Sequence, residues 1–174
     1  IRVLVNGAWG FASVGSLDTA VLKKAVMDAC GMAKLASARL KTPIKLAPAK
    51  TVEDKVLSKP KKNPQNIAME DKIKTALTIT KTSLSYNNQI KSCGVDYMDL
   101  MGISTFVNSE GTHIEQDKLY VWSRITASAQ TNGAFTFSRE EVGSTSGYEL
   151  FDEQAPEELG KKVAERAIQQ LTAK

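Results

Sequence analysis

Histidine is nearly absent from this sequence: among 174 residues there is one, His113. Zinc sites in proteins use about four ligands, mostly cysteines and histidines at short spacing. Here His113, Cys30, Cys93 and a carboxylate would have to converge from distant elements. The sequence therefore predicts no metal-ligating residue in this chain, and we expect His113 to be an exposed strand residue beside a turn.

Cysteine is scarce as well, and Cys30 and Cys93 stand far apart in apolar patterns. This usage is typical of reduced, buried thiols in a cytoplasmic protein, and a disulfide between them is the less favoured alternative. Nucleophilic catalysis also requires a base beside the nucleophile, and no Gly-x-Ser-x-Gly elbow is present. We therefore predict no catalytic residue and a cytoplasmic location.

Long apolar runs and an excess of one charge are missing too. No run approaches the roughly 20 residues of a membrane-spanning helix, so we expect no membrane association. The 23 basic residues face 19 acidic ones, and the net charge of +4 is weak support for nucleic-acid binding. Tyr120 and Trp122 have the chemistry to stack on bases, but no ribonucleoprotein motif accompanies them, so packing or an interface is the favoured role.

Strand alternation is what the sequence does contain, between residues 89 and 142. Asn108 with Gly111, and later Asn132 with Gly133, supply the chemistry of tight turns. We predict an antiparallel meander with strands near residues 90–98, 103–107, 119–129 and 134–137. In residues 119–129 one face is apolar apart from Ser123, and the other face carries Tyr120, Trp122, Arg124, Thr126 and Ser128.

Helical periodicity appears in three other stretches, residues 18–40, 69–84 and 156–174. The first has a stripe made mostly of alanine, which predicts close packing on the apolar face of the sheet, with Gly31 as a site of close approach. The expected inward positions are Leu22, Val26, Ala29, Ala33, Ala36 and Leu40 in the first helix, Met69, Ile73, Ala76, Leu77, Thr80 and Leu84 in the second, and Leu159, Val163, Ala167 and Leu171 in the third.

Proline is concentrated in one place, residues 41–66, which we expect to be irregular. The run Lys59-Pro-Lys-Lys62 there is interpreted as a solvated loop, with an anionic partner site as the alternative. Residues 52–56 are either a short strand or a turn of helix. The combined prediction is an α+β fold, in which a largely antiparallel sheet (an amino-terminal hairpin plus a long-stranded meander) packs with about three helices.

Three carboxylates, Glu110, Glu115 and Asp117, gather near one predicted hairpin. Paired carboxylates perform acid–base chemistry when burial or a neighbouring charge shifts a pKa. A surface hairpin is often acidic for solubility alone, and this is the favoured interpretation.

Four segments carry a resemblance to a known family: Arg2-Val-Leu-Val-Asn-Gly-Ala-Trp-Gly-Phe-Ala-Ser13, Val52-Glu-Asp-Lys-Val56, Asn108-Ser-Glu-Gly-Thr112 and Gly147-Tyr-Glu149. In order and spacing this set resembles the amino-terminal domain of the TldD/PmbA family. Trp9-Gly-Phe11 is more similar to the TldD type than to the PmbA-like partner.

The resemblance implies a zinc metallopeptidase, also described as a modulator of DNA gyrase, that cleaves peptides or unfolded polypeptides. It implies a homo- or heterodimer with a family partner. The family's metal lies on a His-Glu-x-x-x-His helix, a motif that this sequence lacks. We therefore expect residues 1–174 to be a single amino-terminal domain of a longer two-domain protein whose carboxy-terminal metal-binding domain is absent. Zinc would belong to the full-length parent, and this piece alone is expected to be inactive.

The role implied for this piece is that of a substrate-cleft or scaffold domain in proteolysis and peptide maturation. The alternative is a non-catalytic partner or regulatory domain of the same family that acts by protein–protein interaction. We expect the cleft or interface hairpin to consist of Asn108, Ser109, Glu110 and Gly111, with an extended peptide added as a strand along an exposed edge of the meander. Nucleic acid is not an expected partner.

Overall fold

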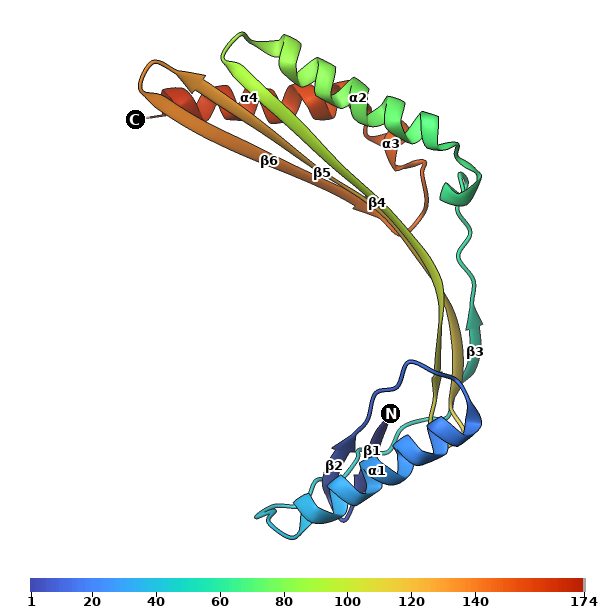
Figure 1. The fold of residues 1–174 in the computed structure, drawn as a ribbon. Helices are drawn as coiled ribbons and strands as arrows, with labels where there is room; N and C mark the ends of the chain where they lie inside the picture. Colours follow the sequence, from blue (N-terminus) through green and yellow to red (C-terminus); the bar gives the residue numbers. More distant parts are fainter. Residues whose placement is uncertain (174) are drawn as a thin grey trace. The chain divides into compact units, whose positions relative to one another are not determined.

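The computed structural model describes residues 1–173, and the chain forms two compact units, Ile1–Lys50 and Thr51–Lys174 (Figure 1). Each unit has its own sheet and its own helical cover. The predicted α+β class with largely antiparallel pairing is confirmed. That these residues form one amino-terminal domain of a longer protein stays a prediction.

The smaller unit is a hairpin with one helix packed on it. Strands β1 (Arg2–Val5) and β2 (Ala8–Phe11) pair antiparallel, and α1 (Thr19–Ser37) lies against them. Asn6 and Gly7 have φ values of 50° and 77°, as a two-residue hairpin turn requires. A Cβ on Gly10 would lie 1.9 Å from the carbonyl oxygen of Ala29, so this glycine lets the helix approach β2 closely.

The packing of α1 corrects the sequence-based expectation in three respects. The helix covers its own hairpin instead of the apolar face of the long sheet, and it buries Ala25, Ala29 and Ala33. Val26 and Leu40 are exposed. Gly31 has open space where a Cβ would lie, so it is not a site of close approach. Alanines four residues apart form a flat surface on one side of the helix, and this surface packs against Gly10 of the hairpin.

The larger unit is built on four strands, β3 (Glu53–Val56), β4 (Ile90–Val107), β5 (His113–Thr131) and β6 (Ala134–Ser144). Strands β4 and β6 pair antiparallel with β5, and β3 pairs parallel with its beginning. The predicted strands 90–98 and 103–107 are one strand, because the β4–β5 ladder runs from Ser92 to Val107 without a shift in register. Strand β6 also continues beyond Phe137, where we had expected the pattern to end.

Helices cover one face of this sheet (Figure 1). They are α2 (Met69–Tyr86), which follows the short 3₁₀ helix η1 (Pro64–Asn66), and α4 (Pro156–Thr172), which follows the one-turn α3 (Leu150–Glu153). The predicted inward face of residues 119–129 and the predicted stripe of α4 meet in the core, and Tyr148 and Phe151 close one end of it. The core residues of β5 and α4 are Val121, Ile125, Ala127, Ala129, Leu159, Val163, Ala164 and Ala167.

Helix α2 turns a different face inward from the one predicted. Met69, Ile73, Leu77 and Leu84 are exposed, whereas Ile79 and Ser83 are fully buried. The reason is the crossing with α4, where a Cβ on Gly160 would lie 2.4 Å from the carbonyl oxygen of Ile79. Backbones this close require small residues at the contact, and that requirement outweighs the apolar periodicity.

Candidate functional site

The predicted cleft hairpin is a tight turn held by the side chain of Asn108. Its Oδ1 accepts the backbone N–H groups of Glu110 (3.1 Å) and Thr112 (2.9 Å). Gly111 has φ 92°, which a β-carbon would strain. The segment before β3 also joins the turn, since the Thr51 hydroxyl donates to the carbonyl of Glu110 at 3.0 Å. The residues Asn108, Ser109, Glu110 and Gly111 are therefore an exposed but well-defined loop.

The nearby carboxylates do not form an acid–base pair. Glu115 makes an ion pair with Lys55 on β3, and this hydrogen bond and charge lower the pKa of Glu115. Asp117 accepts the backbone N–H of Ser58 at 3.1 Å. Each carboxylate is thus used to hold the β3 segment to β5. His113 is exposed at the start of β5, as predicted.

Strand β4 has a free edge. It is 18 residues long and pairs with β5 on one side only; among the described residues no strand pairs with its other side. An unpaired edge presents backbone donors and acceptors to any extended chain that lies alongside it. The last part of β4 also contributes Met101 and Ile103 to a hollow of about 300 Å³, whose other lining residues include Ser58, Asn63, Gln65 and Leu119.

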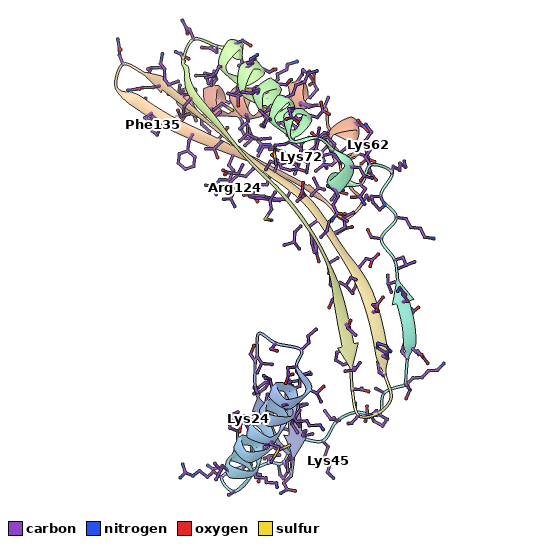
Figure 2. The ribbon with its side chains drawn as sticks, turned by 45° about the vertical axis from the view of Figure 1, so that its right-hand side comes forward. Lys24, Lys45, Lys62, Lys72, Arg124 and Phe135 are labelled. Atoms are coloured by element: carbon purple, nitrogen blue, oxygen red, sulfur yellow. The ribbon has the colours of Figure 1, made fainter. Side chains whose placement is uncertain are left out.

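The sheet face opposite the helices is the one on which Tyr120 and Trp122 were predicted, and the structure adds residues of β4 and β6 to it. In β6 the hydroxyls of Thr136 and Ser138 donate to carbonyls of α4, so Phe135 and Phe137 point the other way. Figure 2 shows Arg124 and Phe135 on the side of the sheet away from Lys72 of α2. We call the part of this surface that lies opposite α2 and α4 the open face; its apolar members are Met98, Leu100, Tyr120, Trp122, Phe135 and Phe137.

The Gly147-Tyr-Glu149 segment holds the run Lys59-Pro-Lys-Lys62, which we call the basic loop, against the core. Glu149 is 6% exposed, and its two carboxylate oxygens accept the backbone N–H groups of Lys61 and Lys62, each at 3.0 Å. Burial raises the pKa of Glu149, but the backbone donors outweigh that effect and hold it below its usual range. Gly147 has φ 150° and leaves room for the Lys62 carbonyl. Lys62 itself pairs with Asp152, which favours the solvated-loop interpretation of this run.

A second polar cluster joins the start of α2 to β4. The Tyr97 hydroxyl donates to Asp99 at 2.8 Å, and Lys72 makes an ion pair with the same carboxylate. Burial and the neighbouring Asp99 raise the pKa of Tyr97, so the phenol is neutral. Burial alone would raise the pKa of Asp99, yet the hydrogen bonds from Lys72 and Tyr97 lower it. Because the cluster fixes an ionised carboxylate beside a cation, it stabilises the helix–sheet contact.

The residues present do not fit a metal. Across residues 1–173 no group of three or more histidines, cysteines and acidic side chains is placed to bind one, so we derive no metal-dependent step for this chain. Cys30 and Cys93 are free and half-buried, less buried than expected, and burial raises the pKa of the Cys93 thiol. None of the described helices has the length and apolar character to cross a bilayer.

Comparison with known proteins identifies the larger unit. A family model described as the PmbA/TldA metallopeptidase central domain matches residues 62–171, more than half of the chain. A protein from Methanothermobacter thermautotrophicus named metalloprotease is 27% identical over 173 residues, which is 99% of this chain and 36% of that protein. A metalloprotease from Methanocaldococcus jannaschii is 26% identical over 174 residues, 100% of this chain and 38% of that protein.

Solved structures share the fold. A protein from Bacteroides thetaiotaomicron described as a modulator of DNA gyrase superposes with a TM-score of 0.74 at 19% identity, over 99% of this chain and 39% of that one. A second, from Thermotoga maritima, gives 0.70 at 17% identity, over 99% and 37%. TldE from Thermococcus kodakarensis gives 0.59 at 17% identity, over 98% and 36%. The chain thus spans little more than a third of the relatives that it matches.

Proposed function

Because the chain belongs to the PmbA/TldA metallopeptidase family, we propose that it is the substrate-cleft or scaffold part of a zinc-dependent peptidase that acts in proteolysis and peptide maturation. Its partners would be a peptide or unfolded polypeptide and a family subunit, in a homo- or heterodimer in the cytoplasm. The family match over residues 62–171 carries this proposal, and it confirms the resemblance to TldD/PmbA proteins drawn from the sequence.

The free edge of β4 supports a role in holding peptide. An extended chain added to this edge gains backbone hydrogen bonds that are independent of its sequence, which suits a peptidase with varied substrates. Its alternate side chains would lie beside Met101 and Ile103, at the hollow of about 300 Å³. The Asn108–Gly111 turn closes the end of the same β4–β5 hairpin, and we propose that it faces the cleft or the dimer partner.

The test uses the full-length protein that contains this chain, loaded with zinc, and a fluorogenic unfolded polypeptide. Replacing Gly111, at φ 92°, with valine should lower kcat/KM for cleavage by about tenfold or more and leave the zinc content unchanged. The matched control is Gly133→Val, which carries the same kind of strain (φ 102°) in the β5–β6 turn and should leave cleavage near the wild-type rate. Equal losses in both variants, or lost zinc with unchanged kinetics, would refute the placement of the hairpin.

The second candidate is a non-catalytic partner subunit. It is favoured by one observation, the likeness to a structure named TldE, which is weaker than the likeness to the two described as modulators of DNA gyrase. The full-length protein alone, saturated with zinc and free of other family members, separates the two roles. Cleavage by that preparation supports the peptidase; cleavage only after a family partner is added supports the partner subunit.

A further inference from the structure

The open face has the composition of a contact surface. Phe135 and Phe137 are 63% and 56% exposed, and Met98 and Leu100 are 48% and 50% exposed. The solvated face of a sheet normally carries polar side chains, and groups of large exposed apolar side chains mark binding surfaces. Methionine and aromatic side chains also adapt to partners of different sequence.

Two glycines of β4 lie on the same surface. Gly94 and Gly102 lie in β4 at positions that alternate onto the open face, and nothing lies within 4 Å of the place where a Cβ would stand. Glycine inside a strand weakens it, and one recognised reason to keep it is close approach by a ligand or another backbone. Among residues 1–173 no neighbour requires these two glycines.

The apolar residues of the open face form two clusters. Leu100 pairs with Tyr120 and Met98 with Trp122, whereas Phe137 pairs with Ser128, six residues further along β5. Six residues of strand correspond to roughly 20 Å. An occupant that contacts both clusters must therefore be long. About six residues of extended polypeptide bridge the gap, and about eight to ten cover both clusters from end to end, because Phe135 pairs with Gln130.

Charge and curvature exclude two other occupants. Arg124 lies 4.8 Å above the Trp122 ring, but its guanidinium is paired with Glu141, and Asp96 is its neighbour on β4. Arg139 is the other cation of this part of the face, so two carboxylates balance two cations and there is no basic excess to attract a nucleic-acid backbone. In Figure 1 the sheet of the larger unit curves with the open face on the inner side. Two such faces would meet only at their ends, so a second copy of the same surface does not cover it.

We propose that the open face binds an extended polypeptide segment with apolar side chains near both ends, one end at Met98, Leu100, Tyr120 and Trp122 and the other at Phe135 and Phe137. This inference deepens the proposed function, because the segment would be part of the peptidase's polypeptide substrate. The surface is distinct from the free edge of β4: the edge recognises backbone, and the open face recognises side chains.

The test is binding to the full-length protein, measured by fluorescence anisotropy with three labelled probes. The first is a ten-residue Gly/Ser peptide with a Leu-Phe pair at each end, the second has the pair at one end only, and the third is a ten-nucleotide oligothymidine. The double variant Phe135→Ser/Phe137→Ser should weaken binding of the first peptide at least tenfold. The control is Met69→Ser/Leu77→Ser, which removes two exposed apolar side chains from α2 and should change the affinity by less than twofold.

Circular dichroism checks that both variants fold, and a photoreactive phenylalanine at position 135 of the otherwise native protein should crosslink to the first peptide. The proposal is overturned if the double variant folds and binds as the native protein does, if the two peptides bind equally, if the crosslink fails, or if oligothymidine binds more tightly. A native protein that binds but does not cleave the peptide contradicts the proposed peptidase. One that cleaves with an unchanged KM in the double variant contradicts only this inference.

Discussion

Replacing Glu149 with glutamine tests the fastening of the basic loop. The native carboxylate accepts two backbone N–H groups, from Lys61 and Lys62, at 3.0 Å each. Hydrogen bonds to a charged acceptor contribute about 1.5–3 kcal/mol each, and a buried donor left without an acceptor costs about 1–3 kcal/mol. Glutamine keeps one acceptor oxygen and turns an NH₂ group toward the other donor. We therefore expect the larger unit to lose about 2–3 kcal/mol of unfolding free energy at neutral pH.

The assay is urea unfolding followed by tryptophan fluorescence. The sequence has two tryptophans, and replacing Trp9 with phenylalanine leaves Trp122 as the reporter of the larger unit. With an m-value of about 1–3 kcal/mol per molar urea, the midpoint should fall by about 1–2 M. The control is Glu153→Gln, an exposed carboxylate one turn later, which should move the midpoint by less than about 0.3 M.

The lowered pKa of Glu149 fixes the direction in which its contribution to stability changes with pH. The pKa of Glu149 is lower in the folded chain than its ordinary value, so its contribution is complete above the ordinary glutamate value of about 4.3. It is lost as the pH falls through the lowered folded pKa. The difference between native protein and variant should therefore be largest near pH 7 and shrink in more acidic solution. A variant as stable as the native protein at pH 7, or a difference that does not shrink with acid, would refute the reasoning.

Two further pairs of substitutions probe the helices. Gly160→Ala places a Cβ 2.4 Å from the Ile79 carbonyl oxygen and should destabilise the larger unit by about 1–3 kcal/mol. Gly31→Ala places its Cβ in open space and should stabilise the smaller unit by up to about 1 kcal/mol. Thermal unfolding of both variants checks that the two effects have opposite signs. Asp99→Asn leaves Lys72 without its carboxylate and should cost about 1–3 kcal/mol in urea unfolding at pH 7, a loss that Lys72→Met in the same chain should partly recover.

Local backbone chemistry is the part of this fold that the sequence predicts well. The predicted amino-terminal hairpin turns at Asn6-Gly7, and Asn108 with Gly111 forms the expected turn, because left-handed φ values and side-chain-to-backbone bonds select those residue types. Pro156 begins α4 as predicted, and the stripe of Leu159, Val163 and Ala167 is buried. Each of these depends on a few neighbouring residues, so a single sequence contains the information.

Long-range packing is the part that the sequence does not predict. Which apolar face of α2 turns inward depends on Gly160, more than 70 positions away, and α1 could satisfy its alanine stripe on either sheet. The length of β4 was missed because Gly102 resembles a strand end, although its antiparallel partner Lys118 continues the ladder. For the candidate site, the turn at Asn108 was predicted, whereas the fastening role of Glu149 required the fold to bring residues 61 and 149 together.

The glycines of the long strands all lie on one face of the sheet. Gly94, Gly102 and Gly143 all alternate onto the open face, and no glycine of β4, β5 or β6 lies on the face that the helices cover. A Cβ on Gly143 would lie 3.4 Å from Cδ1 of Trp122, an ordinary contact distance, and nothing lies within 4 Å of the place where a Cβ on Gly94 or Gly102 would stand. Each costs roughly 0.5–1 kcal/mol relative to alanine. A face that only met solvent would gain stability from side chains there, so the retained glycines and the exposed aromatic residues have one common explanation, which is contact with another polypeptide.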